Sequence, residues 1–143
     1  MRLKSKLFDF ETEDYEKLSS SQLKRQADYW LRKYLLKNTD SNGNRYFCPL
    51  KERWFSAEQM HVAHFIDRSS ICTRYDLDNC HLISSNSNTF DAQVQVEGFK
   101  SLHHKEYSDW LGEEKVKQLI EKNKQICLYY PSDYIEIIKK FRE

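Results

Sequence analysis

The sequence contains no long run of apolar residues, no internal repeat and no low-complexity tract. A membrane-spanning helix needs about 20 consecutive, mostly apolar residues, so we expect none in this chain. The first residues, Met1 to Lys4, lead quickly into further charged residues and lack the pattern of a secretory signal. These absences predict a cytosolic protein without membrane association.

An excess of charge of either sign is also missing. The 23 Lys and Arg residues face 22 Asp and Glu residues, so the formal net charge is only +1. Tight non-specific DNA-binding proteins typically carry a strongly basic field, and this composition excludes one. Any binding of nucleic acid must therefore depend on local groups of basic side chains.

Regular cysteine motifs are absent as well. The chain has four cysteines without a pairing pattern, namely Cys48, Cys72, Cys80 and Cys127. In an intracellular protein of this size, such a distribution argues against a disulfide framework. We expect all four thiols to be reduced.

The chain does have enough apolar material for one folded domain. It is 143 residues long, with 39% hydrophobic and 14% aromatic residues. This length is in the usual range of single domains, and this composition opposes disorder. We expect one α+β domain, with a helical segment over residues 1–40, a core over residues 45–95 and helices over residues 99–143.

The clearest helix signal runs from Ser20 to Asn38. Ser19 and Gln22 have the spacing of a capping box at its start. A buried stripe is predicted from apolar residues at helical spacing: Leu23, Ala27, Trp30, Leu31, Tyr34 and Leu35. Basic residues also lie on this helix, and we interpret them as a solvated face in preference to a DNA contact: Lys24, Arg25, Arg32, Lys33 and Lys37.

Three more helices are predicted after the core. The first carries an apolar stripe that Gly112 ends as a C-terminal cap: Phe99, Leu102, His103, Tyr107, Trp110 and Leu111. The second continues from Glu113 to Lys122. The chain breaks at Pro131, and Ser132 opens the last helix, which turns one apolar face inward: Tyr134, Ile135, Ile138 and Phe141.

The most informative pattern is a histidine followed by two asparagines, His64, Asn79 and Asn88. Hydrolysis of a phosphodiester needs a base that activates water and a divalent cation that stabilises charge on the phosphate. Histidine can be the base near neutral pH. A hard cation such as Mg²⁺ accepts one or two protein oxygens together with substrate phosphate, so the Asn88 carboxamide is a candidate ligand.

This pattern resembles the HNH, or His-Me finger, nuclease superfamily. Within it, the chain is most similar to the phage recombination endonuclease family NinG/Rap, over roughly residues 22–120. The matching segments are Ala63-His64-Phe65, Arg74-Tyr75, Asp78-Asn79 and His81. The resemblance implies a β-hairpin followed by a helix (ββα), surrounded by further helices. Its parts are a strand over residues 60–65, a loop over residues 66–79, a strand over residues 80–83 and a helix from 85 to about 93.

The resemblance also implies roles for single residues. His64 would deprotonate water, Asn79 would position that base, and Asn88 would hold Mg²⁺ or Mn²⁺. His81, on the second strand, is a possible contact to substrate or metal, depending on which way strand alternation turns it. In the loop, Arg68 and Arg74 are candidate phosphate ligands, since a guanidinium offers paired donors.

Simpler interpretations remain open for both asparagines and for His61. Asn79 can pin the loop by hydrogen bonds to local backbone. Asn88 can be no more than a helix cap. His61, three residues before the candidate base, is expected to be structural.

Two departures from the relatives concern metals. Relatives carry two Cys-x-x-Cys knuckles that bind zinc through four thiolates, whereas this chain keeps only Cys48 and has Lys51, Ser84 and Ser87 at the other places. We therefore expect no structural zinc, and a replacement core from nearby aromatic residues: Tyr46, Phe47, Trp54 and Phe55. Ala63 also stands where HNH proteins at large place a second metal ligand, which implies a thinner metal site.

The sequence thus predicts a metal-dependent DNA endonuclease of phage recombination or branched-DNA processing, in the cytoplasm of a bacterial host if the chain is phage-derived. One alternative is a non-catalytic nucleic-acid-binding or interaction protein that keeps the HNH fold. Another is a general phage HNH nuclease with packaging or homing roles. The oligomeric state is left open.

Overall fold

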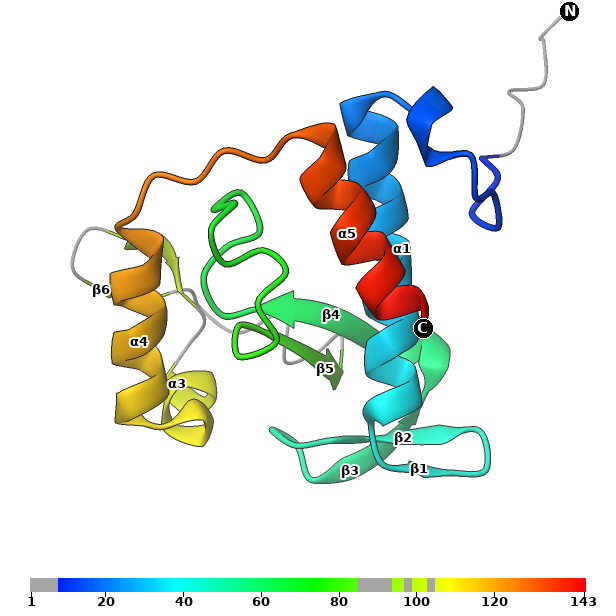
Figure 1. The fold of residues 1–143 in the computed structure, drawn as a ribbon. Coiled ribbons are helices and arrows are strands. Elements are labelled where there is room, and N and C mark those ends of the chain that lie inside the picture. The colour runs from blue at the N-terminus through cyan, green and yellow to red at the C-terminus, as the bar shows by residue number, and fades with distance from the viewer. Residues whose placement is uncertain (1–7, 85–93, 97–98, 103–104) are drawn as a thin grey trace, which may run out of the picture.

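The computed structural model describes residues 8–84, 94–96, 99–102 and 105–143 (Figure 1). The helices are α1 (Ser20–Asn38), α3 (Lys105–Leu111), α4 (Glu113–Asn123) and α5 (Pro131–Arg142), with short 3-10 turns at Tyr15–Lys17 and Ala57–Gln59. The strands are β1 (Ser41–Asn42), β2 (Arg45–Cys48), β3 (Arg53–Ser56), β4 (Met60–His64), β5 (Cys80–Ser84), β6 (Val94–Val96) and β7 (Phe99–Leu102). They form three small antiparallel sheets, so the expected α+β class is confirmed. Within these ranges, no helix has both the length and the apolar character that crossing a bilayer requires.

Helices α1 and α5 lie side by side and form one wall of the molecule (Figure 1). The predicted capping box starts α1, since the Ser19 hydroxyl accepts from the Gln22 amide at 3.2 Å and the Gln22 side chain accepts from the Ser19 amide at 2.8 Å. The predicted stripe is buried against α5, and one cluster contains Leu23, Ala27, Leu31, Tyr134, Ile138 and Phe141. The bounds and the buried face of α1 are therefore confirmed.

The β4–β5 hairpin lies between this wall and helices α3 and α4 (Figure 1). His64 is opposite Cys80, and Ala63 is opposite His81. Because residues that face each other across a hairpin share one side of it, His64 and His81 point to opposite faces. Both predicted strands are confirmed. The helix predicted over residues 85–93 lies outside the described residues.

A second hairpin is formed by β2 and β3. Phe47 faces Trp54 across it, with ring centroids 5.4 Å apart. Tyr46 and Phe55 pack against the main core, as predicted. Cys48 is fully buried, and its sulfur accepts a hydrogen bond from the amide of Ser84 at 3.4 Å. Cys48 and Ser84, two of the positions that the resemblance compares with zinc ligands, are thus neighbours in space.

The helix predicted from Phe99 is wrong at its start. Residues 99–102 form β7, which pairs with β6, and α3 begins only at Lys105. A short apolar run fits a strand as well as a helix, so periodicity alone could not decide. Gly112 does follow the end of α3, with φ of +93°, and it also precedes α4. A single glycine in this backbone conformation therefore separates two helices.

The expectation of four reduced thiols is wrong for one pair. Cys72, in the loop between β4 and β5, forms a disulfide with Cys127, in the segment between α4 and α5. Their separation of 55 residues offers no spacing motif, and only the fold brings them together. Cys48 and Cys80 are free and buried.

Candidate functional site

His64 ends β4 and is held through one ring nitrogen. Its Nε2 lies 2.9 Å from the carbonyl oxygen of Arg74. Since a carbonyl can only accept, we assign the proton to Nε2, which leaves the lone pair of Nδ1 available. Burial lowers the pKa of His64 to about 4, with smaller contributions that include the positive charges of Arg74 and Arg68. The ring is therefore neutral at pH 7.

Asn79 closes the loop that follows His64. Its side chain is fully buried, accepts from the amide of Ile66 at 2.7 Å, and donates to the carbonyl oxygens of Ile66 and Thr73, both at 3.0 Å. Its own carbonyl accepts from the amide of Phe65 at 2.9 Å. The interpretation of Asn79 as a loop-pinning residue is confirmed. By fixing the residue after His64, it also fixes the backbone that carries the ring.

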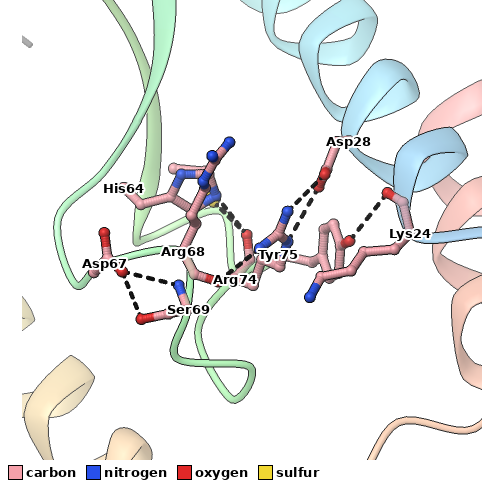
Figure 2. A network of polar contacts seen from close by, with 9 residues as sticks. Lys24, Asp28, His64, Asp67, Arg68, Ser69, Arg74 and Tyr75 are labelled. Carbon is pink, nitrogen blue, oxygen red and sulfur yellow. Dashed lines mark hydrogen bonds and ion pairs between the residues drawn. The ribbon is translucent and has the colours of Figure 1, made fainter. Parts of the chain in front are cut away.

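Arg74 joins the loop to α1 (Figure 2). Its guanidinium donates to both oxygens of Asp28, at 2.6 and 3.2 Å, and to the carbonyl oxygen of Arg68 at 2.8 Å. The side chain is only 8% exposed. Sequence reasoning placed Arg74 among the phosphate ligands and missed Asp28. The structure instead places the Arg74 side chain in an intramolecular ion pair, while its carbonyl holds His64.

Arg68 differs from Arg74 in its surroundings. It is exposed, and no hydrogen bond or ion pair of its guanidinium is found among the described residues. Figure 2 shows this side chain beside the His64 ring, and its charge contributes to the lowered pKa of His64. Of the two predicted phosphate ligands, Arg68 is thus the accessible one.

Asp67 is a site residue that sequence reasoning missed. One of its carboxylate oxygens accepts from the amide of Ser69 at 3.1 Å and from the Ser69 hydroxyl at 2.5 Å. The hydroxyl bond is the largest cause of the lowered pKa of Asp67, and the charges of Arg68 and His64 act in the same direction. The second oxygen, Oδ1, has no hydrogen bond within the described part of the chain. The sequence signal was present, because an Asp with a Ser two residues later is typical of a local turn.

His81 lies on the far side of the hairpin. Its Nδ1 shares a hydrogen bond with the Tyr107 hydroxyl, and its ring meets that of Trp110 edge-on, with centroids 4.8 Å apart. Burial, followed by the charge of Lys115, lowers the pKa of His81 to about 4. The structure therefore does not bring His81 to His64, and His61 shares the His81 face.

The described residues offer few metal ligands. They contain no group of three or more His, Cys, Asp or Glu side chains that could hold a metal ion. The predicted ligand Asn88 lies outside the described residues. Near His64, the available hard donor is Oδ1 of Asp67. One such oxygen fits Mg²⁺ or Mn²⁺, since this kind of cation keeps several waters and takes substrate phosphate oxygens as further ligands.

Comparisons of the chain with protein-family models, with curated proteins and with solved structures give no match. The chemistry of the site therefore has to be argued from its own geometry. That geometry groups a neutral, oriented imidazole, an accessible guanidinium and an ionised carboxylate at the start of one loop.

Proposed function

We propose that the protein is a metal-dependent endonuclease that hydrolyses phosphodiester bonds in DNA, with His64 as the general base. The observation that carries this proposal is the bond from Nε2 of His64 to the Arg74 carbonyl. A general base must be unprotonated and fixed at the atom that takes the proton. The low pKa keeps His64 unprotonated near neutral pH. The carbonyl bond at Nε2 fixes the ring and leaves Nδ1 as the atom that takes the proton.

In this proposal each neighbouring residue has one task. Nδ1 of His64 takes a proton from the attacking water, while Asn79 and the Arg74 carbonyl keep the ring in place. The Arg68 guanidinium donates to a phosphate of the backbone. A bound Mg²⁺ or Mn²⁺ supplies charge stabilisation on the phosphate and the leaving oxygen. Its proposed protein ligands are Asp67 and, outside the described residues, Asn88.

A second candidate function is binding of nucleic acid without cleavage. Two observations favour it. A histidine with a pKa of about 4 is a weak base, and general-base efficiency falls with basicity. Of the two carboxylates near His64 in the described part of the site, Asp28 has both oxygens bound by Arg74, so only Asp67 has an oxygen to offer a metal. This agrees with the thin metal site expected from Ala63.

The decisive experiment is nicking of supercoiled plasmid with Mn²⁺ or Mg²⁺ and with chelator. The parent should nick only with metal, and His64→Ala should be slower by roughly 10²–10⁴-fold, the usual contribution of a general base. His61→Ala is the matched control, because it lies on the same strand but on the opposite face. It should nick at the parent rate. Circular dichroism checks that all three proteins are folded.

Two outcomes would contradict the nuclease. The first is a folded His64→Ala variant that nicks as fast as the parent. The second is a parent protein that binds DNA but nicks with neither metal, which is the result expected of the second candidate. Among active substrates, a four-way junction cut faster than linear duplex would support a role on branched DNA.

A further inference from the structure

A cleft with a volume of about 300 Å³ runs along β5. Leu77 of the β4–β5 loop lines it, whereas Asp67 and Arg68 of the same loop do not. Its walls come from the end of α1, the β2–β3 hairpin and α3, and β5 forms its floor. This volume is at the lower end of the range of small-molecule sites, which is roughly 300–1,000 Å³. No residue proposed to act in cleavage lines it.

Aromatic rings dominate the walls of this cleft. Tyr34, Phe47, His81 and Trp110 all line it. His81 and Trp110 meet edge-on, and Trp110 is 44% exposed, so a large part of its indole is open to a ligand. Aromatic side chains of this kind bind flat heterocycles by stacking, at about 1–3 kcal/mol for each nucleobase.

The floor adds a polar edge to the cleft. The amide of Phe65 donates to the carbonyl of Asn79, so these opposed residues form a hydrogen-bonded pair of the antiparallel ladder. Such pairs alternate along the ladder. Leu82 therefore turns its N–H and C=O away from β4, and β4 is the only strand paired with β5 among the described residues. Leu82 lines the cleft but is only 4% exposed, so only a small part of this donor and acceptor edge is open at the floor.

The rim carries acceptors rather than basic groups. The Asn38 side chain uses its nitrogen to bond the Tyr34 carbonyl, which leaves its oxygen as an acceptor, and the Asp40 carboxylate lines the same edge. Both groups can accept from the amino or imino groups of a heterocycle, and the negative charge of Asp40 repels a phosphate. The chemistry of the cleft thus matches a base and opposes a phosphate inside it.

We propose that this cleft binds one unpaired nucleobase of single-stranded DNA, stacked on Trp110 with an amino or imino group of its polar edge toward the side-chain oxygen of Asn38. The base must be unpaired, because in a duplex that edge is occupied by the complementary base. The site is separate from His64 and does not require that the protein cleaves DNA. If it does, the cleft directs cleavage to substrates with single-stranded segments.

The test measures binding of a fluorescent eight-nucleotide DNA by anisotropy, with chelator present. Trp110→Ala removes the ring on which the base stacks, so its affinity for the oligonucleotide should be roughly 5- to 100-fold weaker than that of the parent. Trp110→Phe, which keeps an aromatic face, should bind within about threefold of the parent. The matched control is Trp54→Ala, since Trp54 is similarly exposed, at 41%, and does not line the cleft. It should bind as the parent does.

Binding of three further ligands distinguishes an unpaired base from other occupants of the cleft. The same oligonucleotide with abasic sites, and the same sequence as a duplex, should both bind more weakly than the intact single strand. Equal binding of either one, parent-like affinity of Trp110→Ala, or an equal loss in Trp54→Ala would overturn the proposal. So would a free deoxynucleoside monophosphate that competes at the Kd of the strand, because the ligand would then be a free nucleotide. Absence of plasmid nicking does not affect this readout.

Discussion

The loop between β4 and β5 is held from two sides by different chemistry. On the α1 side, Arg74 forms its ion pair with Asp28. On the α4 side, the loop is joined by the Cys72–Cys127 disulfide, and Lys122 of α4 contacts Asp76 at 2.6 Å. Figure 1 shows the loop between these two parts of the molecule.

The two attachments act on different states of the protein. A disulfide stabilises mainly by restricting the unfolded chain. The Arg74–Asp28 pair acts in the folded state, where it fixes the residue whose carbonyl bonds His64. The disulfide thus contributes to stability without touching the site, whereas the ion pair contributes to stability and to site geometry, so the effects of changing the two attachments should be separable.

Removing the disulfide should have the largest effect on stability. For a separation of 55 residues, Cys127→Ser should lower the free energy of unfolding by about 4 kcal/mol. The pKa of His64 should stay near 4, because the ion pair to α1 is untouched. Urea unfolding measures the first quantity and NMR titration the second. A reductant should reproduce the loss in the parent and have no effect on the variant. Four thiols alkylated in the parent after it is denatured without reductant would contradict the bond, because only Cys48 and Cys80 are free.

Removing the ion pair should affect both stability and the site. Arg74→Ala leaves Asp28 without its partner and should cost about 3 kcal/mol, the low end for a broken buried pair, since Asp28 is partly exposed. The pKa of His64 should also move from about 4 toward 6.5, because water reaches the buried ring, the positive charge of Arg74 is lost and the Asp28 carboxylate is left unpaired. These effects should outweigh a weaker bond to the residue-74 carbonyl, which by itself would lower the pKa.

Arg68→Ala is the matched control for this change. It removes the same type of side chain from the same loop, but at an exposed position, so the free energy of unfolding should change by no more than about 0.5 kcal/mol. Its effect should instead be weaker DNA binding. Equal stability losses in Arg68→Ala and Arg74→Ala would show that the Arg74–Asp28 contact does not hold the loop.

The smallest expected effect is a loss of stability in acid. It should come from His64 and His81, which lie on opposite faces of the hairpin. Burial lowers both pKa values to about 4 in the folded state, below 6.5. The unfolded chain therefore binds more protons between these values, and stability present above pH 6.5 is lost as the pH falls toward 4. Because the rings are partly exposed, each loss should be on the order of 1 kcal/mol.

Unfolding at a series of pH values checks this. His64→Gln and His81→Gln should each remove part of the pH dependence. Arg74→Ala should reduce the part of the pH dependence that comes from His64 and leave the part that comes from His81 unchanged, because Arg74 contacts His64 and not His81. A flat stability profile from pH 7 to pH 4.5 in the parent would contradict the buried, neutral state of both rings.

Local signals in the sequence predicted much of this fold. The capping box at Ser19, the apolar stripe of α1 and the proline that begins α5 each involve residues within a few positions of one another. The loop-closing role of Asn79 also followed from local pattern, whereas the strand around His64 was expected from the resemblance to HNH nucleases. The prediction that failed was the helix over Phe99 to Leu102, which is a strand. A run of four residues is too short for its apolar pattern to distinguish a strand from a helix.

The partners of the site residues were not predictable in the same way. Asp28 meets Arg74 across 46 positions, and Cys72 meets Cys127 across 55. No periodicity or spacing rule joins such residues. The opposite orientations of His64 and His81 did follow from strand alternation, but only once the register of β4 against β5 was known.

The pairing of α1 with α5 has a consequence for the order in which the protein folds. The two helices are separated in sequence by residues 39–130, yet they form one cluster with Leu23 and Ile138 at its centre. During synthesis, α1 emerges early and keeps its apolar stripe exposed until α5 leaves the ribosome. Closing so long a segment has an entropic cost before the contact forms, which slows folding. The nascent chain therefore presents a helix-shaped binding site for chaperones while residues 39–130 are translated.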